Sequence, residues 1–340
     1  MHSVEIVQSC GGIIGPIESE TSVDLATNLP IFILGLALLT FGAHSFVHGA
    51  VNLAMALRIS QLMIGLTVVA FGTSAPELFL DVTAATRGAV ELAFGDLVGS
   101  NIANIGLILA VAALTRPLVL QSRLLRVELP LVVGISAGLW LMASDGEVDR
   151  VDGIIILAAF AGFLLLMIRS AKRENREVKL EIKSMAVDGE AWPKSMLYFV
   201  GGLLAMVGGA HLMVLSATSL ARALGISDLV IGLTIVAIGT SLPELATSVM
   251  ATVRKQADIS VGNVLGSNVF NILFVMGICA LIQPLPVQVE SLRVDLPIML
   301  GSVALVGLFV MRGQRLGRAG GAVLLVGYVL YQIYLWNMVQ

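Results

Sequence analysis

The sequence is poor in charge, histidine and cysteine, and each shortage excludes a class of protein. Only 13% of its 340 residues are charged, whereas an ordinary soluble domain carries about a quarter. Four histidines and two cysteines give no transition-metal cluster, and Cys10 and Cys279 should lie too far apart to form a disulfide. Residues 1–29 contain no Lys or Arg. They therefore lack the basic region of a cleavable signal peptide, and we expect them to form an external tail.

Hydrophobic residues, by contrast, make up 57% of the chain, and the mean hydropathy is +0.95. A helix that spans a bilayer needs about 20 apolar residues, and backbone groups in lipid must be satisfied within the segment. The sequence thus predicts an all-α polytopic membrane protein whose outer helices contact membrane lipid. We count ten apolar stretches, at 30–57, 62–87, 91–115, 125–144, 151–170, 195–222, 229–254, 258–281, 291–311 and 319–337.

The basic residues indicate how these stretches are oriented. If the spans are joined in series, 16 of the 20 Lys and Arg residues fall on one side of the membrane. Lys and Arg collect in cytoplasmic loops. The other side holds only Arg87, Arg150, Arg222 and Arg293. We therefore expect a multi-pass protein of the cell inner (plasma) membrane with both termini external.

The chain is a duplication. Residues 42–130 align with 209–297 without a gap, so that IGLTVVAFGTSAPEL (64–78) meets IGLTIVAIGTSLPEL (231–245). Each copy holds five spans, an odd number, so the second copy enters the membrane from the opposite side. Such inverted repeats are common in secondary transporters. We expect an external N-terminal tail at 1–29, a first five-helix repeat at 30–170, a cytoplasmic linker at 171–194 and a second five-helix repeat at 195–340.

Each repeat carries Gly-Thr-Ser-x-Pro-Glu in the middle of its second span. A carboxylate at membrane depth costs about 2.5–3.5 kcal/mol or more, so Glu77 and Glu244 are functional candidates. Proline and glycine should break the helices near Gly72–Pro76 and Gly239–Pro243, which frees carbonyl oxygens. Hydroxyls are added by Thr73, Ser74, Thr240 and Ser241. A proline kink repaired by Ser and Thr would explain every residue of the motif except the glutamate. Hard oxygens of this kind suit Ca²⁺ and, by extension, Na⁺.

The next span of each repeat carries Gly-Ser-Asn-x-x-Asn. Ser100 and Asn104 are four residues apart and share one helical face, as do Ser267 and Asn271. Small and polar residues also serve helix packing, which is the competing interpretation. If these four neutral side chains face the two glutamates, their oxygens would complete the coordination of a cation.

Two further acids, Asp81 and Asp96, have no acidic counterpart, because Ser248 and Asn263 occupy the matching positions of the second repeat. Either aspartate could be a vestibule charge, a proton site, or a solvated residue near the membrane surface.

These doubled motifs resemble those of the calcium/cation antiporter superfamily, in particular the prokaryotic sodium/calcium exchangers. The resemblance covers about residues 30–338. It implies ten transmembrane helices in two inverted five-helix repeats, with four ion sites at the centre. It also implies that the long first helices of the repeats, 30–57 and 195–222, slide across the rest.

The same resemblance implies a set of ion ligands, carried over by motif position. They are the carboxylates of Glu77 and Glu244 for Ca²⁺ and Na⁺, oxygens of Thr73 and Thr240 in the calcium site, backbone carbonyls of Ala70 and Ala237, oxygens of Ser74, Ser241, Ser100 and Ser267 at the outer sodium sites, and Asn104 and Asn271 at the middle position.

One position departs from the pattern. Many relatives, including the potassium-dependent exchangers, have aspartate where this chain has Asn271, so we do not expect K⁺ co-transport. The two remaining carboxylates neutralise one Ca²⁺, whereas three Na⁺ would leave a net positive charge. Three-to-one exchange would therefore be electrogenic.

The sequence thus predicts a secondary active antiporter that exchanges Na⁺ for Ca²⁺ by alternating access, with Ca²⁺ leaving the cell. A Ca²⁺/H⁺ antiporter on the same scaffold remains open, and a passive channel would not need two matched broken helices. We do not expect an enzyme, because the chain contains no H-E-x-x-H, no Ser or Cys paired with His and no phosphate loop. We expect a monomer with Ca²⁺ and Na⁺ as its transported ions, no other cofactor and no nucleic-acid partner.

Overall fold

The structure is a computed structural model of the chain, and it describes residues 25–120, 124–182, 192–223, 237–311 and 315–339. Helices account for nearly all of these residues. Those of the first half are α2 (Leu25–Leu57), α3 (Gln61–Ile64), η1 (Gly65–Val69), α4 (Ala70–Thr73), α5 (Ala75–Thr86), α6 (Val90–Ala103), η2 (Asn104–Leu109), α7 (Ala110–Thr115), η3 (Leu124–Glu128), α8 (Leu129–Met142), η4 (Ala143–Asp145) and α9 (Arg150–Ile182). Those of the second half are α10 (Trp192–Ala223), α12 (Ala237–Thr240), α13 (Leu242–Val253), α14 (Ala257–Phe270), η6 (Asn271–Val275), α15 (Met276–Ile282), η7 (Ser291–Asp295), α16 (Leu296–Met311) and α17 (Arg318–Val339).

Within the described residues, eight helices are long and apolar enough to cross a membrane. A ninth candidate is the pair Gln61–Thr73 and Ala75–Thr86, which is bent by 48° at a break. The stretch expected to span at 229–254 lies partly outside the described residues. The chain is therefore an all-α, multi-pass membrane protein, as its apolar stretches predict.

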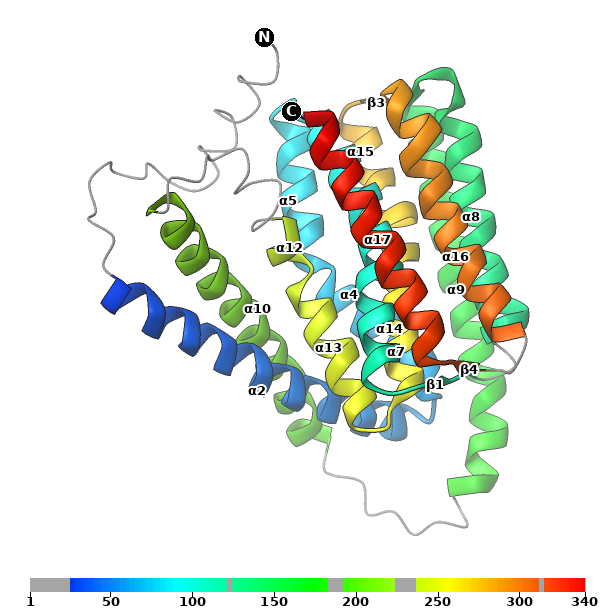
Figure 1. The fold of residues 1–340 in the computed structure, drawn as a ribbon. Helices are drawn as coiled ribbons and strands as arrows, with labels where there is room; N and C mark the ends of the chain where they lie inside the picture. The colour runs from blue at the N-terminus through cyan, green and yellow to red at the C-terminus, as the bar shows by residue number, and fades with distance from the viewer. Residues whose placement is uncertain (1–24, 121–123, 183–191, 224–236, 312–314, 340) are drawn as a thin grey trace.

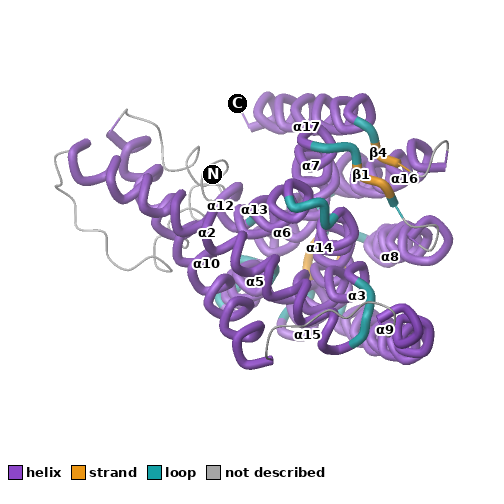
Figure 2. The backbone as a smooth tube through the Cα atoms, turned by 90° about the horizontal axis from the view of Figure 1, so that it is seen from below, coloured by secondary structure: helices purple, strands orange, loops and turns teal. Residues whose placement is uncertain are grey.

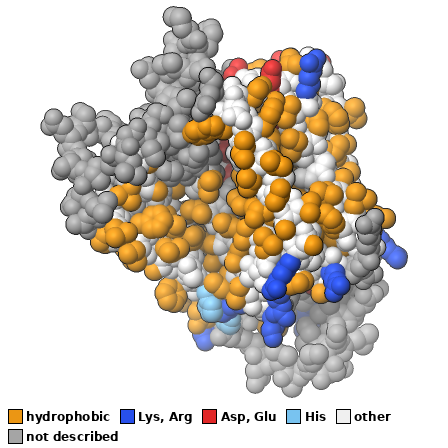
Figure 3. All heavy atoms as spheres, in the orientation of Figure 1, with side chains coloured by type: hydrophobic (Ala, Val, Ile, Leu, Met, Phe, Trp, Pro, Cys, Tyr) orange, Lys and Arg blue, Asp and Glu red, His pale blue; other side chains and the backbone are white. Residues whose placement is uncertain are grey.

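The surface agrees with this assignment. Figure 3 shows one face on which hydrophobic side chains cover the middle, with most of the visible Lys and Arg toward one end and the visible Asp and Glu toward the other. An apolar band between charged ends is typical of a protein that spans a bilayer.

Helices α2 and α10 lie side by side along one flank of the molecule (Figures 1 and 2). Glycines make this contact possible, because an added Cβ would meet the partner backbone. At Gly42 it would lie 2.6 Å from the Met206 nitrogen, and at Gly209 it would lie 2.5 Å from the Leu39 nitrogen. Small residues of this kind let the backbones of membrane helices touch.

The two most buried spans form the centre of the bundle. The most apolar window of Val90–Thr115 is 72% buried and that of Ala257–Ile282 is 78% buried, against 22–33% for the other six spans. In Figure 2, α6 and α14 lie between the α2–α10 pair and α8, α9, α16 and α17. Polar residues on these two central spans therefore face protein rather than lipid.

Wide π-helical turns interrupt both central spans and the first bent span. They are η2, η6 and η1, and η2 and η6 begin at Asn104 and Asn271. Such turns often mark functional sites because the extra residue redirects the neighbouring side chains.

Four two-residue strands tie loops of the two halves together. The strands β1 (Leu118–Val119) and β4 (Arg315–Leu316) pair antiparallel, with Leu118 opposite Leu316. The strands β2 (Glu147–Val148) and β3 (Leu285–Pro286) pair in the same way, with Val148 opposite Leu285.

Candidate ion-binding site

Both predicted helix breaks are confirmed, and each falls on a serine. Ser74, between α4 and α5, has φ −83° and ψ 7°, and Ser241, between α12 and α13, has φ −87° and ψ 2°. The proline that follows lies in the first turn of the next helix, where its missing N–H has no helical partner to lose. Pro76 therefore begins a new helix and leaves the Gly72 carbonyl without its helical donor.

The breaks place the two glutamates at helix starts. Glu77 lies in the first turn of α5 and Glu244 in the first turn of α13. Each carboxylate also accepts a hydrogen bond from its own backbone N–H. The N-terminus of a helix stabilises negative charge, which partly offsets burial of side chains that are only 2% and 1% exposed.

Contacts across the duplication bring the two motifs together. The Ser74 hydroxyl donates to Glu244 Oε1 at 3.0 Å and lies 3.0 Å from Ser267 Oγ. Glu77 and Glu244 are close enough for their charges to interact. One acid from each half therefore meets the other inside the protein.

Four buried side-chain oxygens of the predicted ligands receive no hydrogen bond. They are Glu77 Oε2, Glu244 Oε2, Asn104 Oδ1 and Asn271 Oδ1. The turn η2 packs against α13 and η6 packs against α5, which brings each asparagine turn onto the helix of one glutamate. Buried polar atoms almost always have a partner, so four unpartnered acceptors together fit a cation that is held by oxygen.

Most of the other predicted ligands are also buried. Thr73, Ser74, Ser267, Ser100 and Ser241 are buried. Thr240 is half-buried, and Ala237 begins α12 with its side chain outside the described part. The Ala70 carbonyl already accepts from Ser74 N at 3.0 Å and from Thr73 Oγ1 at 3.3 Å, so a cation would have to share that oxygen.

Several asparagines that the sequence did not single out as ligands connect the site. Thr73 Oγ1 donates to Asn263 Oδ1 at 3.0 Å, and Asn104 Nδ2 donates to Asn268 Oδ1 at 2.9 Å. Asn268 Nδ2 donates a hydrogen bond to the backbone carbonyl oxygen of Asn101 at 3.3 Å. Asn101 and Asn268 are the third residues of the doubled Gly-Ser-Asn motif, so the repetition could have identified them.

The side chains of the site are mainly oxygen donors. In the described ranges, no three His, Cys, Asp or Glu side chains converge in a way that could hold a metal ion. The site thus offers two carboxylates and neutral amide and hydroxyl oxygens, which favour hard cations such as Ca²⁺ and Na⁺ over softer ones.

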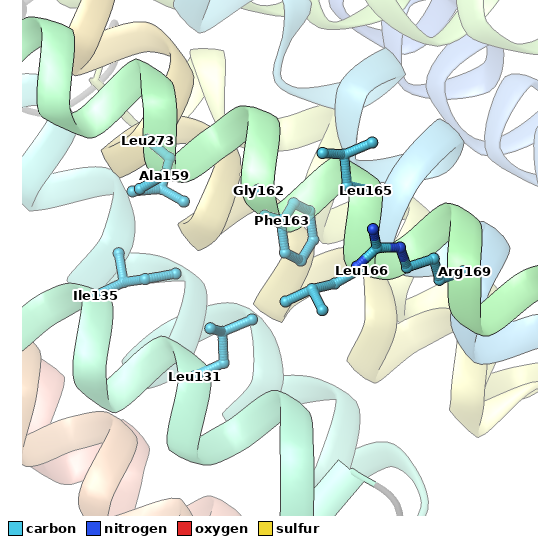
Figure 4. A pocket seen from close by; sticks show the side chains of 9 residues that line it. All are labelled: Leu131, Ile135, Ala159, Gly162, Phe163, Leu165, Leu166, Arg169 and Leu273. Carbon is cyan, nitrogen blue, oxygen red and sulfur yellow. The ribbon is translucent and has the colours of Figure 1, made fainter.

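A pocket of about 370 Å³ lies elsewhere, between α8 and α9. Figure 4 shows its lining of apolar side chains, with Arg169 at one end. None of the predicted ligands lines it, so it is separate from the polar cluster.

Comparison with known proteins agrees with the resemblance of the motifs. The sequence matches the family described as sodium/calcium exchanger protein over residues 27–169 and 194–337. It is 37% identical to the inner membrane protein YrbG of Escherichia coli strain K12 over 318 residues, 92% of this chain and 97% of that protein. It is 30% identical to the sodium/calcium exchanger MaX1 of Methanosarcina acetivorans over 348 residues, 92% of this chain and 99% of MaX1.

A solved structure shows the same fold. The sodium-calcium exchanger NCX_Mj, soaked with zero Na⁺ and Ca²⁺, superposes with a TM-score of 0.79 at 31% identity, covering 91% of this chain and 98% of NCX_Mj. A family match across most of the chain, two relatives of nearly the same length and a shared fold lead to one assignment: this protein belongs to the sodium/calcium exchanger family of membrane transporters.

Proposed function

We propose that this protein is a secondary active antiporter that exchanges Na⁺ for Ca²⁺ across the inner (plasma) membrane and moves Ca²⁺ out of the cell. The observation that carries the proposal is the set of four unpartnered buried oxygens, on Glu77, Glu244, Asn104 and Asn271. The names of MaX1 and NCX_Mj as sodium/calcium exchangers support the choice of ions.

Competition for the same oxygens would couple the two ions. Ca²⁺ accepts six to eight oxygen ligands in flexible geometry, and the two carboxylates neutralise its charge. When Na⁺ ions occupy the site instead, three of them leave one net positive charge. Moving one charge across a potential of about 100 mV changes the free energy by about 2.3 kcal/mol, so exchange in this ratio would respond to voltage.

Alternating access requires one part of the protein to move against another, and the α2–α10 pair is the candidate. Its helices touch through glycines, so they would move together. A cavity of about 250 Å³ lies between this pair and the bundle, with Phe32 and Met213 on one side and Gly239 on the other. Gly239 belongs to the second broken segment, so the cavity lies between the moving pair and that segment.

The proposal includes a topology of ten transmembrane helices in two inverted repeats of five, with both termini external. The matched positions of the two broken segments support it, since Ser74 and Ser241 interrupt their helices in the same way. So do the matched π-helical turns that begin at Asn104 and Asn271.

Flux of radioactive ⁴⁵Ca²⁺ into proteoliposomes, with gradients of Na⁺, K⁺ and H⁺ imposed one at a time, tests the proposal. We expect Ca²⁺ uptake to follow the Na⁺ gradient and to respond to a potential set with a K⁺ ionophore. Uptake driven by a pH gradient without Na⁺ would favour Ca²⁺/H⁺ exchange, an alternative supported by two additional acids, the buried Asp81 and the half-buried Asp96. Absence of gradient-driven Ca²⁺ uptake in functional liposomes would contradict both.

A further inference from the structure

The two repeats differ at one hydrogen-bonded pair. In the second repeat, Asn263 Nδ2 donates to Ser248 Oγ at 3.0 Å. The matching residues of the first repeat are Asp96 and Asp81. A neutral donor and acceptor in one half are therefore replaced by two carboxyl groups in the other.

The two aspartates contact each other between α5 and α6. Asp81 is 0% exposed. Neither oxygen of Asp81 receives a hydrogen bond from a donor, and neither does the buried Oδ2 of Asp96. When both groups are ionised, the two carboxylates therefore present only acceptors to one another.

The surroundings do not supply the missing positive charge. The titratable groups that interact with Asp81 and Asp96 are Glu77, one turn earlier on α5, and the buried thiol of Cys279 on α15. Glu244 lies beyond, next to Glu77. In the part of the chain that the structure describes, no Lys, Arg or His forms an ion pair with either aspartate.

Two carboxylates in contact cannot both stay ionised in a buried site without a neutralising charge. Leaving a charge buried without a partner costs several kcal/mol. A cation between the two groups resolves the conflict.

We propose that Asp81 and Asp96 form a cation subsite beside the central one, and that it holds one exchangeable monovalent cation, either H⁺ or Na⁺. One cation suffices to relieve the conflict, because a single positive charge shared by the two carboxylates removes their mutual repulsion and leaves one net negative charge on the pair. A divalent ion such as Ca²⁺ would need about six to eight oxygens, more than this pair offers.

The location gives the subsite a role in transport, and this role rests on the proposed exchange of Na⁺ for Ca²⁺. Asp81 lies one turn from Glu77 on the same helix, so a cation between the aspartates repels a Ca²⁺ ion bound at Glu77. Ca²⁺ binding would therefore favour release of the monovalent cation, and its return would favour release of Ca²⁺.

The second repeat supplies the matched variant. Asp81→Ser with Asp96→Asn converts the pair into the Ser and Asn of positions 248 and 263, which removes the charge and restores a hydrogen bond. The full-length purified protein is unfolded thermally in detergent, once across a pH series without Na⁺ and once across a Na⁺ series at constant pH. Thermal unfolding reports cation binding and does not depend on transport. A protein that fails to transport Ca²⁺ would therefore contradict the proposed exchange, but it would not affect this test of the subsite.

Both series are run on the protein with Glu77→Gln and Glu244→Gln, in which the central carboxylates no longer contribute a cation response. We expect its unfolding midpoint to shift in one of the two series, and the added double substitution of the aspartates to remove that shift. Loss of the pH response identifies H⁺ as the cation, and loss of the Na⁺ response identifies Na⁺. If the protein with the added double substitution does not fold, Asp96→Asn alone serves, because the amide can donate to Asp81. Equal responses with and without the aspartate substitutions in both series would overturn the subsite.

Discussion

Replacing Glu244 with glutamine removes one negative charge from the proposed cation site while leaving its shape almost unchanged. Glutamine keeps the oxygen that accepts the hydrogen bond from Ser74 Oγ, 3.0 Å away in the unmodified protein. The remaining difference is the loss of one of two carboxylates that would face Ca²⁺. Removing one partner of a buried ion pair typically costs about 3–5 kcal/mol, so we expect Ca²⁺ affinity to fall by about 10²-fold or more.

Glu77→Gln should have a similar effect, because Glu77 is equally buried and also lies in the first turn of its helix. Calorimetric titration in detergent measures the affinity, and ⁴⁵Ca²⁺ uptake into proteoliposomes measures transport. The thermal midpoint of each variant should not fall, since an unpaired buried charge is being removed.

Glu147→Gln is the matched control, because Glu147 is exposed on β2. It undergoes the same chemical change and should bind and transport Ca²⁺ like the unmodified protein. The reasoning would be refuted if Glu77→Gln or Glu244→Gln kept a Ca²⁺ affinity within about twofold of the unmodified protein, a change of only about 0.4 kcal/mol.

Three further substitutions test other parts of the account. Asn271→Asp adds a third carboxylate to the site, and we expect Ca²⁺ flux to become sensitive to K⁺ or to pH. Gly209→Ala places a Cβ 2.5 Å from the Leu39 nitrogen, so it should destabilise the α2–α10 contact by about 1–3 kcal/mol, measured as a lower thermal midpoint. Ser74→Ala removes a hydrogen bond to a carboxylate, a contribution of about 1.5–3 kcal/mol, and should raise the Na⁺ concentration for half-maximal exchange by about tenfold or more.

Each of these has a result that would contradict it. An unaltered ion profile for Asn271→Asp would mean that this position serves packing alone. Gly208→Ala is the control for the helix contact, because a Cβ there meets nothing within 4 Å. If the two alanine variants unfold at the same temperature, the close approach of the helices does not contribute to stability. Unchanged Na⁺ dependence in Ser74→Ala would remove this serine from the sodium sites.

The parts of the fold that follow from local chemistry were predictable from the sequence. Apolar length marked the long helices, so the expected 30–57 and 195–222 correspond to α2 at 25–57 and α10 at 192–223. The breaks at Ser74 and Ser241 follow from the glycine and proline beside them. The segment expected as a linker is helical as far as Ile182, where charged residues that favour helices continue α9 beyond its apolar part.

The parts that depend on contacts between distant residues were not predictable. The π-helical turn at Gly65–Val69 packs where a Cβ on Gly65 would lie 3.1 Å from the Gly262 Cα, and such a contact leaves no local pattern. The hydrogen bond from Thr73 to Asn263 likewise joins residues 190 positions apart. For the same reason, the contact of Asp81 with Asp96 could not be distinguished from two separate solvated acids.

The length of the α2–α10 pair has a consequence for the lipid. The candidate span of each helix has 31 residues, which is about 46 Å at 1.5 Å per residue. A hydrocarbon layer about 30 Å thick accommodates this length only if the helices are inclined by about 50° from the membrane normal. A thicker or thinner bilayer would change that inclination for both helices at once, so acyl-chain length should control how fast the exchanger turns over.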